Sequence, residues 1–188
     1  RIIGSSLRFE DVYLPFFRQV YGLIPVDGIG IVRIDLAENT FTVDYREESN
    51  VPDRNVGETY PLEGSMTARV VSTGSTYLCH PKDRAEVERL HPGMLPGYDG
   101  GMRSYLCVPF KARDQITGAL HFRTTEANAY NDNHVALAQR IGFLIGAALD
   151  NARLYWETKN AEEAEHRRSE ELQALLATAS ILATGKSF

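Results

Sequence analysis

The feature that most constrains this chain of 188 residues is a helical stretch that runs from Asn133 to Gly185 without a proline to break it. Its first part has an apolar face formed by Ile141, Ile145, Ala148, Ala152 and Tyr155. After the polar stretch 162–168, a second apolar seam follows at Leu172, Leu175, Leu176, Ala179 and Leu182. A helix that leaves a globular body and regains an apolar seam at this spacing packs on a copy of itself or on a following domain. We therefore predict a homodimer through the C-terminal helix.

The two ends of the chain resemble each other. Residues 1–9 and residues 180–188 each contain two neighbouring aliphatic residues, a few small residues, a basic residue and a final phenylalanine. Such a match is what a tandem array would show if one repeat were cut out with the start of the next attached. We therefore expect the sequence to be a piece of a longer, multidomain protein.

The composition is that of an acidic globular protein. A net charge of −5 and a pI near 5.6 give no reason to expect nucleic-acid binding. No apolar run is long enough to span a bilayer, so we expect no direct membrane insertion of this part of the chain. Cys79 and Cys107 are too few for a disulfide framework and suit a reducing, cytoplasmic compartment.

The hydrophobic periodicity predicts an α+β fold. Helices are expected over residues 9–20, 64–72 and 84–90, and strands over residues 29–36, 41–46, 76–80, 104–111 and 116–124. Asn131 is placed to cap the long terminal helix. Because hairpins dominate, we predict a central, mostly antiparallel sheet of five or six strands, with helices packed on it.

Three stretches of the chain resemble the GAF family. Residues 102–110, which end in Val-Pro-Phe, resemble the family's strand that ends in Val-Pro-Leu, and residues 116–122 are similar to its Gly-Val-Leu return strand. Residues 147–155 resemble its final helix, with Ala-Leu-x-Asn-Ala-x-Leu-Tyr nearly intact. The resemblance implies a GAF-like sensory domain over residues 6–156, and leaves residues 157–188 as a connecting helix that leads into a following domain.

The resemblance also implies a ligand site between one face of the sheet and the long connection from Thr76 to Arg103. Residues two apart on an extended segment face the same side, and the glycines of the connection let its far end fold back over the next strand. We therefore predict one cavity for a flat or apolar small molecule, lined by Tyr77, Cys79, Tyr98, Met102 and Tyr105. The alternative is a packed lid that fills its own pocket. The identity of any cofactor stays open.

Several chemistries known in the GAF family do not fit these residues. Members that bind cyclic nucleotides carry an Asn-Lys…Phe…Asp-Glu set, whereas this chain has Tyr130, then His134 and Val135 in the acidic positions, and no Asn-Lys pair. Members that attach a bilin have flanking motifs that Cys79 and His80 lack. Those two residues would also point opposite ways on a strand, which disfavours a zinc site. We expect neither a metal nor a cyclic nucleotide.

We interpret the chain as a regulatory sensory domain of a bacterial signalling protein, such as a sensor histidine kinase, a diguanylate cyclase or an enhancer-binding regulator. A small molecule or a partner would change how the terminal helices of a dimer pack, and thereby act on an output domain. The first alternative is a ligand-free dimerisation spacer. The second is a thiol-dependent free methionine sulfoxide reductase, which needs two cysteines held close together. We do not expect this part of the chain to be an enzyme.

Overall fold

The computed structural model describes residues 22–48, 55–112 and 115–184. The chain divides into two compact units, residues 1–148 and residues 149–188. The helix expected over residues 9–20 lies outside the described residues. Within the part of the chain that the structure describes, no helix combines the length and the apolar character needed to cross a membrane.

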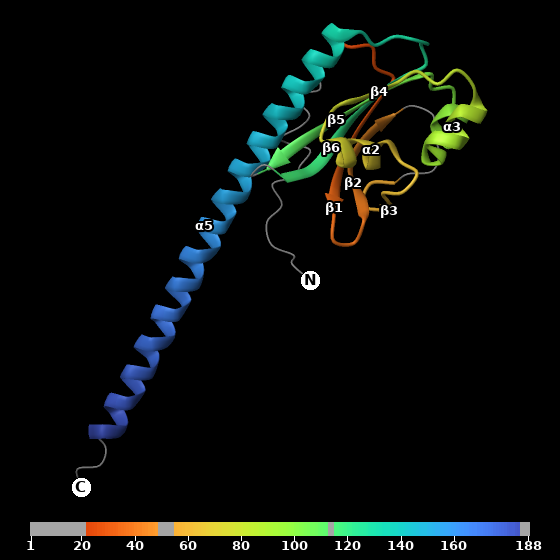
Figure 1. Ribbon diagram of the computed structural model, residues 1–188. Coiled ribbons are helices and arrows are strands. Elements are labelled where there is room, and N and C mark those ends of the chain that lie inside the picture. The colour runs from red at the N-terminus through yellow and green to blue at the C-terminus, as the bar shows by residue number, and fades with distance from the viewer. Residues whose placement is uncertain (1–21, 49–54, 113–114, 185–188) are drawn as a thin grey trace. The chain divides into compact units, whose positions relative to one another are not determined.

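A six-stranded sheet forms the centre of the first unit, as far as the structure describes it (Figure 1). Its strands are β1 (Gly28–Asp35), β2 (Thr40–Glu48), β3 (Thr59–Pro61), β4 (Tyr77–Cys79), β5 (Ser104–Ala112) and β6 (Gln115–Thr124). They lie in the order β3-β2-β1-β6-β5-β4, and every neighbouring pair is antiparallel. The α+β class with an antiparallel sheet is therefore confirmed.

The strand register separates two faces of the sheet. Cys107 is opposite His121 and Val108 is opposite Leu120, so alternate residues along β5 and β6 point to opposite sides. The face of Cys107 carries a hydrophobic cluster, to which β1, β2, β5 and β6 contribute Val32, Phe41, Val43, Tyr105, Cys107 and Ala119. The face of Val108 packs against a long helix.

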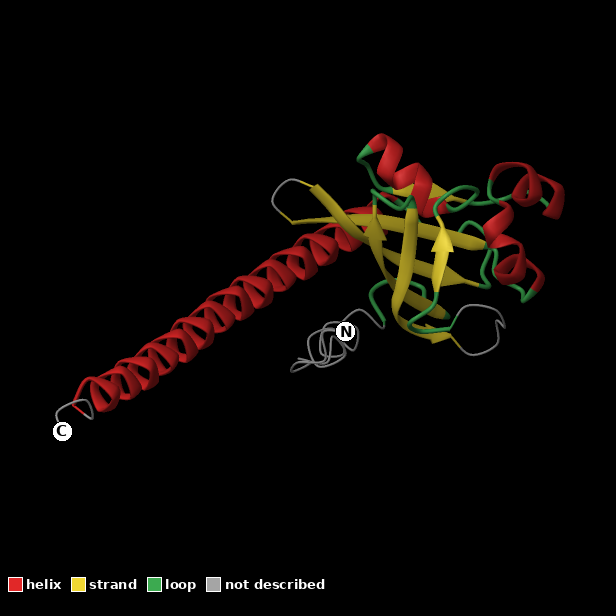
Figure 2. Ribbon diagram, turned by 90° about the horizontal axis from the view of Figure 1, so that it is seen from below, coloured by secondary structure: helices red, strands yellow, loops and turns green. Residues whose placement is uncertain are grey.

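Short helices cover the face of Cys107. Helix α2 (Met66–Thr73) begins where Ser65 Oγ accepts a hydrogen bond from the amide of Ala68, and it contributes Met66 and Val70 to the hydrophobic cluster. Helix α3 (Arg84–Leu90) is capped in the same way by Asp83. Figure 2 shows these helices in red beside the yellow strands. Both were predicted from the sequence, α3 with the same bounds.

Three short elements were not expected. No sequence pattern predicts the edge strand β3. No pattern predicts η1 (Pro92–Met94) or α4 (Leu95–Asp99) either, and both lie at the Gly- and Pro-rich end of the long connection. The prolines of these two helical turns lie in their first turn, Pro92 at the first position of η1 and Pro96 at the second of α4, where the missing amide hydrogen costs no helical hydrogen bond. The end of the connection, residues 95–103, therefore forms a compact, partly helical lid.

The long helix α5 (Asp132–Thr184) begins at the predicted cap. Asn131 Oδ1 accepts hydrogen bonds from the amides of Asn133 at 3.0 Å and His134 at 3.1 Å. In return, His134 Nδ1 lies 3.3 Å from the Asn131 amide and accepts its hydrogen bond. His134 thus takes the place of the acid or amide that usually closes such a reciprocal cap, and it does so with an unprotonated Nδ1.

Two glycines bring the first part of α5 close to β5. A Cβ atom on Gly142 would lie 2.9 Å from a methyl carbon of Val108, and a Cβ atom on Gly146 would lie 2.7 Å from the carbonyl oxygen of Lys111. The neighbouring Ile141 and Ile145 are 6% and 0% exposed. The first unit's own sheet therefore covers this part of the predicted apolar seam.

Candidate functional site

The structure brings the five predicted site residues into one hydrophobic cluster. Met102 and Tyr105 are 3% and 2% exposed and form part of its core. Tyr77, Cys79 and Tyr98 are half-buried and pack against the same core. The pairing of β4 with β5 explains the arrangement, because Cys79 is opposite Tyr105 and Tyr77 is opposite Cys107.

A polar group lies at the edge of this cluster, around Tyr77. The Tyr77 hydroxyl lies 2.9 Å from His91 Nε2, and the guanidinium carbon of Arg69 lies 6.0 Å from the centre of the Tyr77 ring. Burial is the main cause of the raised pKa of Tyr77, and the neighbouring Cys79 raises this pKa further. Burial, together with Arg69, lowers the pKa of His91. The edge thus presents a neutral phenol and a neutral imidazole beside one exposed cation.

Hydrogen bonds to backbone carbonyl oxygens fold the lid over Tyr105. The amide of Met102 donates to the carbonyl oxygen of Gly97 at 3.0 Å, and Arg103 Nη1 donates to the carbonyl oxygens of Tyr98 and Met102, each at 2.8 Å. The same guanidinium lies 4.3 Å from the centre of the Tyr98 ring. The hydroxyl of Tyr105 donates to the carbonyl oxygen of Met102 at 3.3 Å. One arginine therefore fastens the lid to the first residues of β5.

A buried polar contact that no sequence pattern predicted lies deeper on the same face. His121 Nε2 lies 3.2 Å from Thr67 Oγ1 on α2 and 3.6 Å from Cys107 Sγ on β5. All three side chains are buried. Strand alternation places His121 and Phe122 on opposite faces of the sheet, but no sequence signal indicates Thr67 as the partner of His121, because the two lie 54 positions apart.

Burial makes both cysteines weak nucleophiles. It raises the pKa of the Cys107 thiol far above its ordinary value, and it is also the main cause that raises the pKa of Cys79. A reactive cysteine needs the opposite, since the thiolate is the nucleophile. In the described part of the chain, no group of three or more histidine, cysteine or acidic side chains is placed to hold a metal ion.

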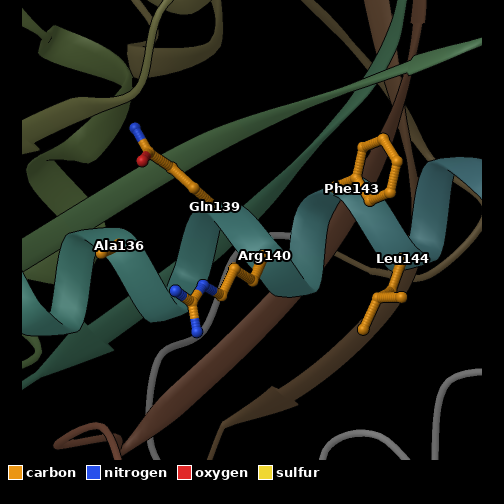
Figure 3. Close-up of a pocket in the computed structure, with 5 residues that line it drawn as sticks. All are labelled: Ala136, Gln139, Arg140, Phe143 and Leu144. Atoms are coloured by element: carbon orange, nitrogen blue, oxygen red, sulfur yellow. The ribbon is translucent and has the colours of Figure 1, made fainter.

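A second candidate surface lies on α5, away from the lid. Ala136, Gln139, Arg140, Phe143 and Leu144 line an open hollow of about 530 Å³ (Figure 3). Phe143 is 75% exposed and Leu144 48% exposed, next to the buried Ile145. Gln139 is held in place by a 3.1 Å hydrogen bond from its Nε2 to Thr76 Oγ1. The hollow is shallow and apolar, which suits a protein surface better than a small polar ligand.

A family model for the GAF domain matches residues 17–150, which is more than half of the chain. The chain belongs to the GAF family. Its members are sensory and regulatory domains of signalling proteins. The matched residues include the whole described sheet, the lid and the beginning of α5.

Solved structures share the fold of this GAF domain at low sequence identity. The GAF domain of a two-component sensor histidine kinase from Bacillus halodurans has a TM-score of 0.62 and 17% identity, and the alignment covers 81% of this chain and 99% of that one. A GAF domain/HD domain protein from Geobacter sulfurreducens has a TM-score of 0.63 and 14% identity, with 78% and 94% covered. A type II free methionine-R-sulfoxide reductase from Thermoplasma acidophilum has a TM-score of 0.58 and 10% identity, with 76% and 94% covered.

We expect His91 to make the domain sensitive to acid. Its pKa is lowered in the folded protein, so the unfolded chain takes up the proton first as the pH falls through about 6.5, the ordinary value for histidine. The His91 contribution to stability is therefore present at neutral pH and is lost below that value. Replacing His91→Gln should reduce the fall in Tm between pH 7 and pH 5. An equal fall in both proteins would show that another group is responsible.

Proposed function

We propose that this GAF domain is a regulatory sensory domain that binds a small molecule under its lid and acts through a dimer of α5 on an output domain. The observation that carries the proposal is the convergence of three tyrosines, a methionine and a cysteine on one cluster, at Tyr77, Tyr98, Tyr105, Met102 and Cys79. Soft and aromatic side chains with a few hydroxyl groups suit a flat, mostly apolar ligand. The lid is also short enough, and rich enough in glycine and proline, to adjust around such a ligand.

The reductase alternative is not favoured. The structural likeness to the Thermoplasma reductase reaches only 10% identity and supports a common fold. Burial raises the pKa of both thiols, whereas a nucleophilic cysteine requires a lowered one. We therefore propose a binding role and no enzymatic activity for this part of the chain.

The spacer alternative differs from our proposal in one respect, which is whether the lid admits a ligand. Gly97 offers a way to test this, because a Cβ atom there would lie 3.5 Å from the Tyr105 hydroxyl, an ordinary contact. Gly97→Ala should therefore leave the lid intact, whereas Gly97→Leu would place a large side chain against Tyr105, where we propose that the ligand binds.

We expect indole and 2-naphthol, two flat probes with one hydrogen-bonding group each, to raise the Tm of the unmodified protein and of Gly97→Ala. The Tm rise should be lost in Gly97→Leu, because binding to the folded state alone stabilises it. Differential scanning fluorimetry over a range of probe concentrations measures the effect. A Tm that no probe raises, or that rises equally in Gly97→Leu, would favour the ligand-free spacer.

A further inference from the structure

His80 joins three separate segments at the end of β4. Its Nδ1 lies 3.0 Å from Ser104 Oγ on β5, and its Nε2 lies 3.3 Å from the carbonyl oxygen of Tyr130, just before α5. The imidazole also stacks on the Tyr130 ring, with the two centres 6.3 Å apart. These contacts connect the strand that carries two of the proposed ligand residues to the start of the long helix.

The hydroxyl of Ser104 is already committed to two other partners. It donates its hydrogen to the carbonyl oxygen of Glu126 at 2.7 Å and accepts a hydrogen bond from the amide of Ala129 at 3.1 Å. A hydroxyl has one hydrogen to donate and two lone pairs to accept with. What remains for His80 is therefore an acceptor, and Nδ1 must carry a proton to bond to it.

The other ring nitrogen of His80 makes the same demand. The carbonyl oxygen of Tyr130 can only accept, so Nε2 must also carry a proton. If only Nδ1 is protonated, the lone pair of Nε2 faces this oxygen. If only Nε2 is protonated, the Ser104 hydroxyl must turn toward the ring, and the Glu126 carbonyl oxygen loses its donor. The doubly protonated ring is the one form that makes all four hydrogen bonds.

We propose that His80 is a proton-dependent latch between β4 and the segment 126–130 that leads into α5. The protonated ring closes the latch, and loss of one proton releases either the Tyr130 contact or the Glu126 contact. A histidine is suited to this role because its charge changes between about pH 5 and pH 8 in the absence of strong perturbation. The inference is independent of whether a ligand binds under the lid.

The elements around His80 carry several other charged or titratable groups. They are Lys82 and Asp83 on its own connection, Arg103 beside Ser104, Glu126 and Tyr130 before α5, Asp132 and His134 at the start of α5, and Asp27 and Arg123, whose charges act on the Tyr130 side chain. His134 touches the Tyr130 ring edge-on, with the centres 6.3 Å apart, and it caps α5 with an unprotonated Nδ1. The hydrogen bonds of the two histidines therefore need opposite protonation states, and variants at each position separate their contributions.

NMR of the full chain, labelled with ¹⁵N and ¹³C, tests the latch between pH 5 and pH 8. We expect both His80 ring nitrogens to be protonated at the acidic end. The carbonyl ¹³C signal of Glu126 or that of Tyr130, according to which contact is released, should then change with pH. In Ser104→Ala a Glu126 response should be lost, because the hydroxyl that transmits it is absent.

Two further variants separate His80 from its neighbours. His80→Gln should abolish the response of the Glu126 and Tyr130 carbonyl signals, whereas His134→Gln keeps an acceptor for the Asn131 amide and should leave that response unchanged. Tyr130→Phe keeps the carbonyl oxygen and removes only the hydroxyl, so it should also respond as the unmodified protein does. Glu126 and Tyr130 carbonyl signals that both stay constant with pH, or that still change in His80→Gln, would overturn the proposal.

Discussion

Gly118→Ala should be among the most destabilising single substitutions in the domain, with a loss of about 3 kcal/mol in the free energy of unfolding. Gly118 lies in β6, opposite Phe110 on β5 and Arg33 on β1. A Cβ atom there would lie 2.5 Å from Phe110 Cε2 and 2.5 Å from the carbonyl oxygen of Val32. The Phe110 ring is buried under α5 and the carbonyl belongs to the backbone, so neither can move away cheaply.

Chemical denaturation of Gly118→Ala measures this loss. Gly97→Ala is the matched control, because its added Cβ meets the Tyr105 hydroxyl at an ordinary 3.5 Å, and it should change the free energy of unfolding little. In the double variant Gly118→Ala with Phe110→Leu, we expect only partial recovery, since the contact with the Val32 carbonyl remains. Equal stability of Gly118→Ala and the unmodified protein would contradict the close packing of β6 on β1 and β5.

The second large effect is expected on the dimer that we propose through α5. Within the first unit, Phe143 is 75% exposed on the helix face that bears the shallow hollow. Along the helix in the second unit, Leu172, Leu175 and Leu176 are 53%, 66% and 69% exposed. Large apolar side chains at three-to-four spacing are typical of a helix that packs on a second helix. A copy of the same chain fits this pattern.

Phe143→Glu should weaken the dimer by at least about 100-fold, because a charge replaces an exposed aromatic side chain that the proposed dimer would bury. Leu90→Glu is the matched control. Leu90 is also an exposed apolar residue, at 42%, but it lies on α3, away from the proposed interface. Sedimentation equilibrium at micromolar concentration measures the dissociation constant. A monomer in all three proteins would contradict the dimer. It would also contradict the spacer and the sensory interpretations, because both require a dimer through α5.

Sequence patterns were sufficient for most of the fold because the periodic signals are local. The alternation in β2 and the capped pattern of α3 each lie within ten residues. The three-residue strand β3 is too short to alternate, and α4 contains a proline and a glycine that favour a turn when tertiary contacts are ignored. Tertiary contacts determine both elements: β3 forms by pairing with β2, and α4 packs against the hydrophobic cluster on the sheet.

The candidate site was predictable in its apolar part and not in its polar part. The two-residue spacing of Tyr77 and Cys79, and the return of the chain at Tyr105, were enough to bring the apolar side chains together. The hydrogen bonds of His80 with Ser104 and Tyr130, and of His121 with Thr67, join residues 24 to 54 positions apart, and the partner groups are hydroxyls and a backbone carbonyl. Such partners are too common in a sequence to be recognised before the fold is known.

The most direct test of the sensory role is hydrogen exchange of the unmodified protein with and without the flat aromatic probe that raises its Tm. We expect slower exchange in the lid, residues 95–103, together with a change at the beginning of α5, residues 132–145. The first change reports ligand binding under the lid, and the second reports its transmission to the helix. A change confined to the lid, with exchange in α5 identical in both samples, would contradict the proposal that this domain passes a signal through its long helix.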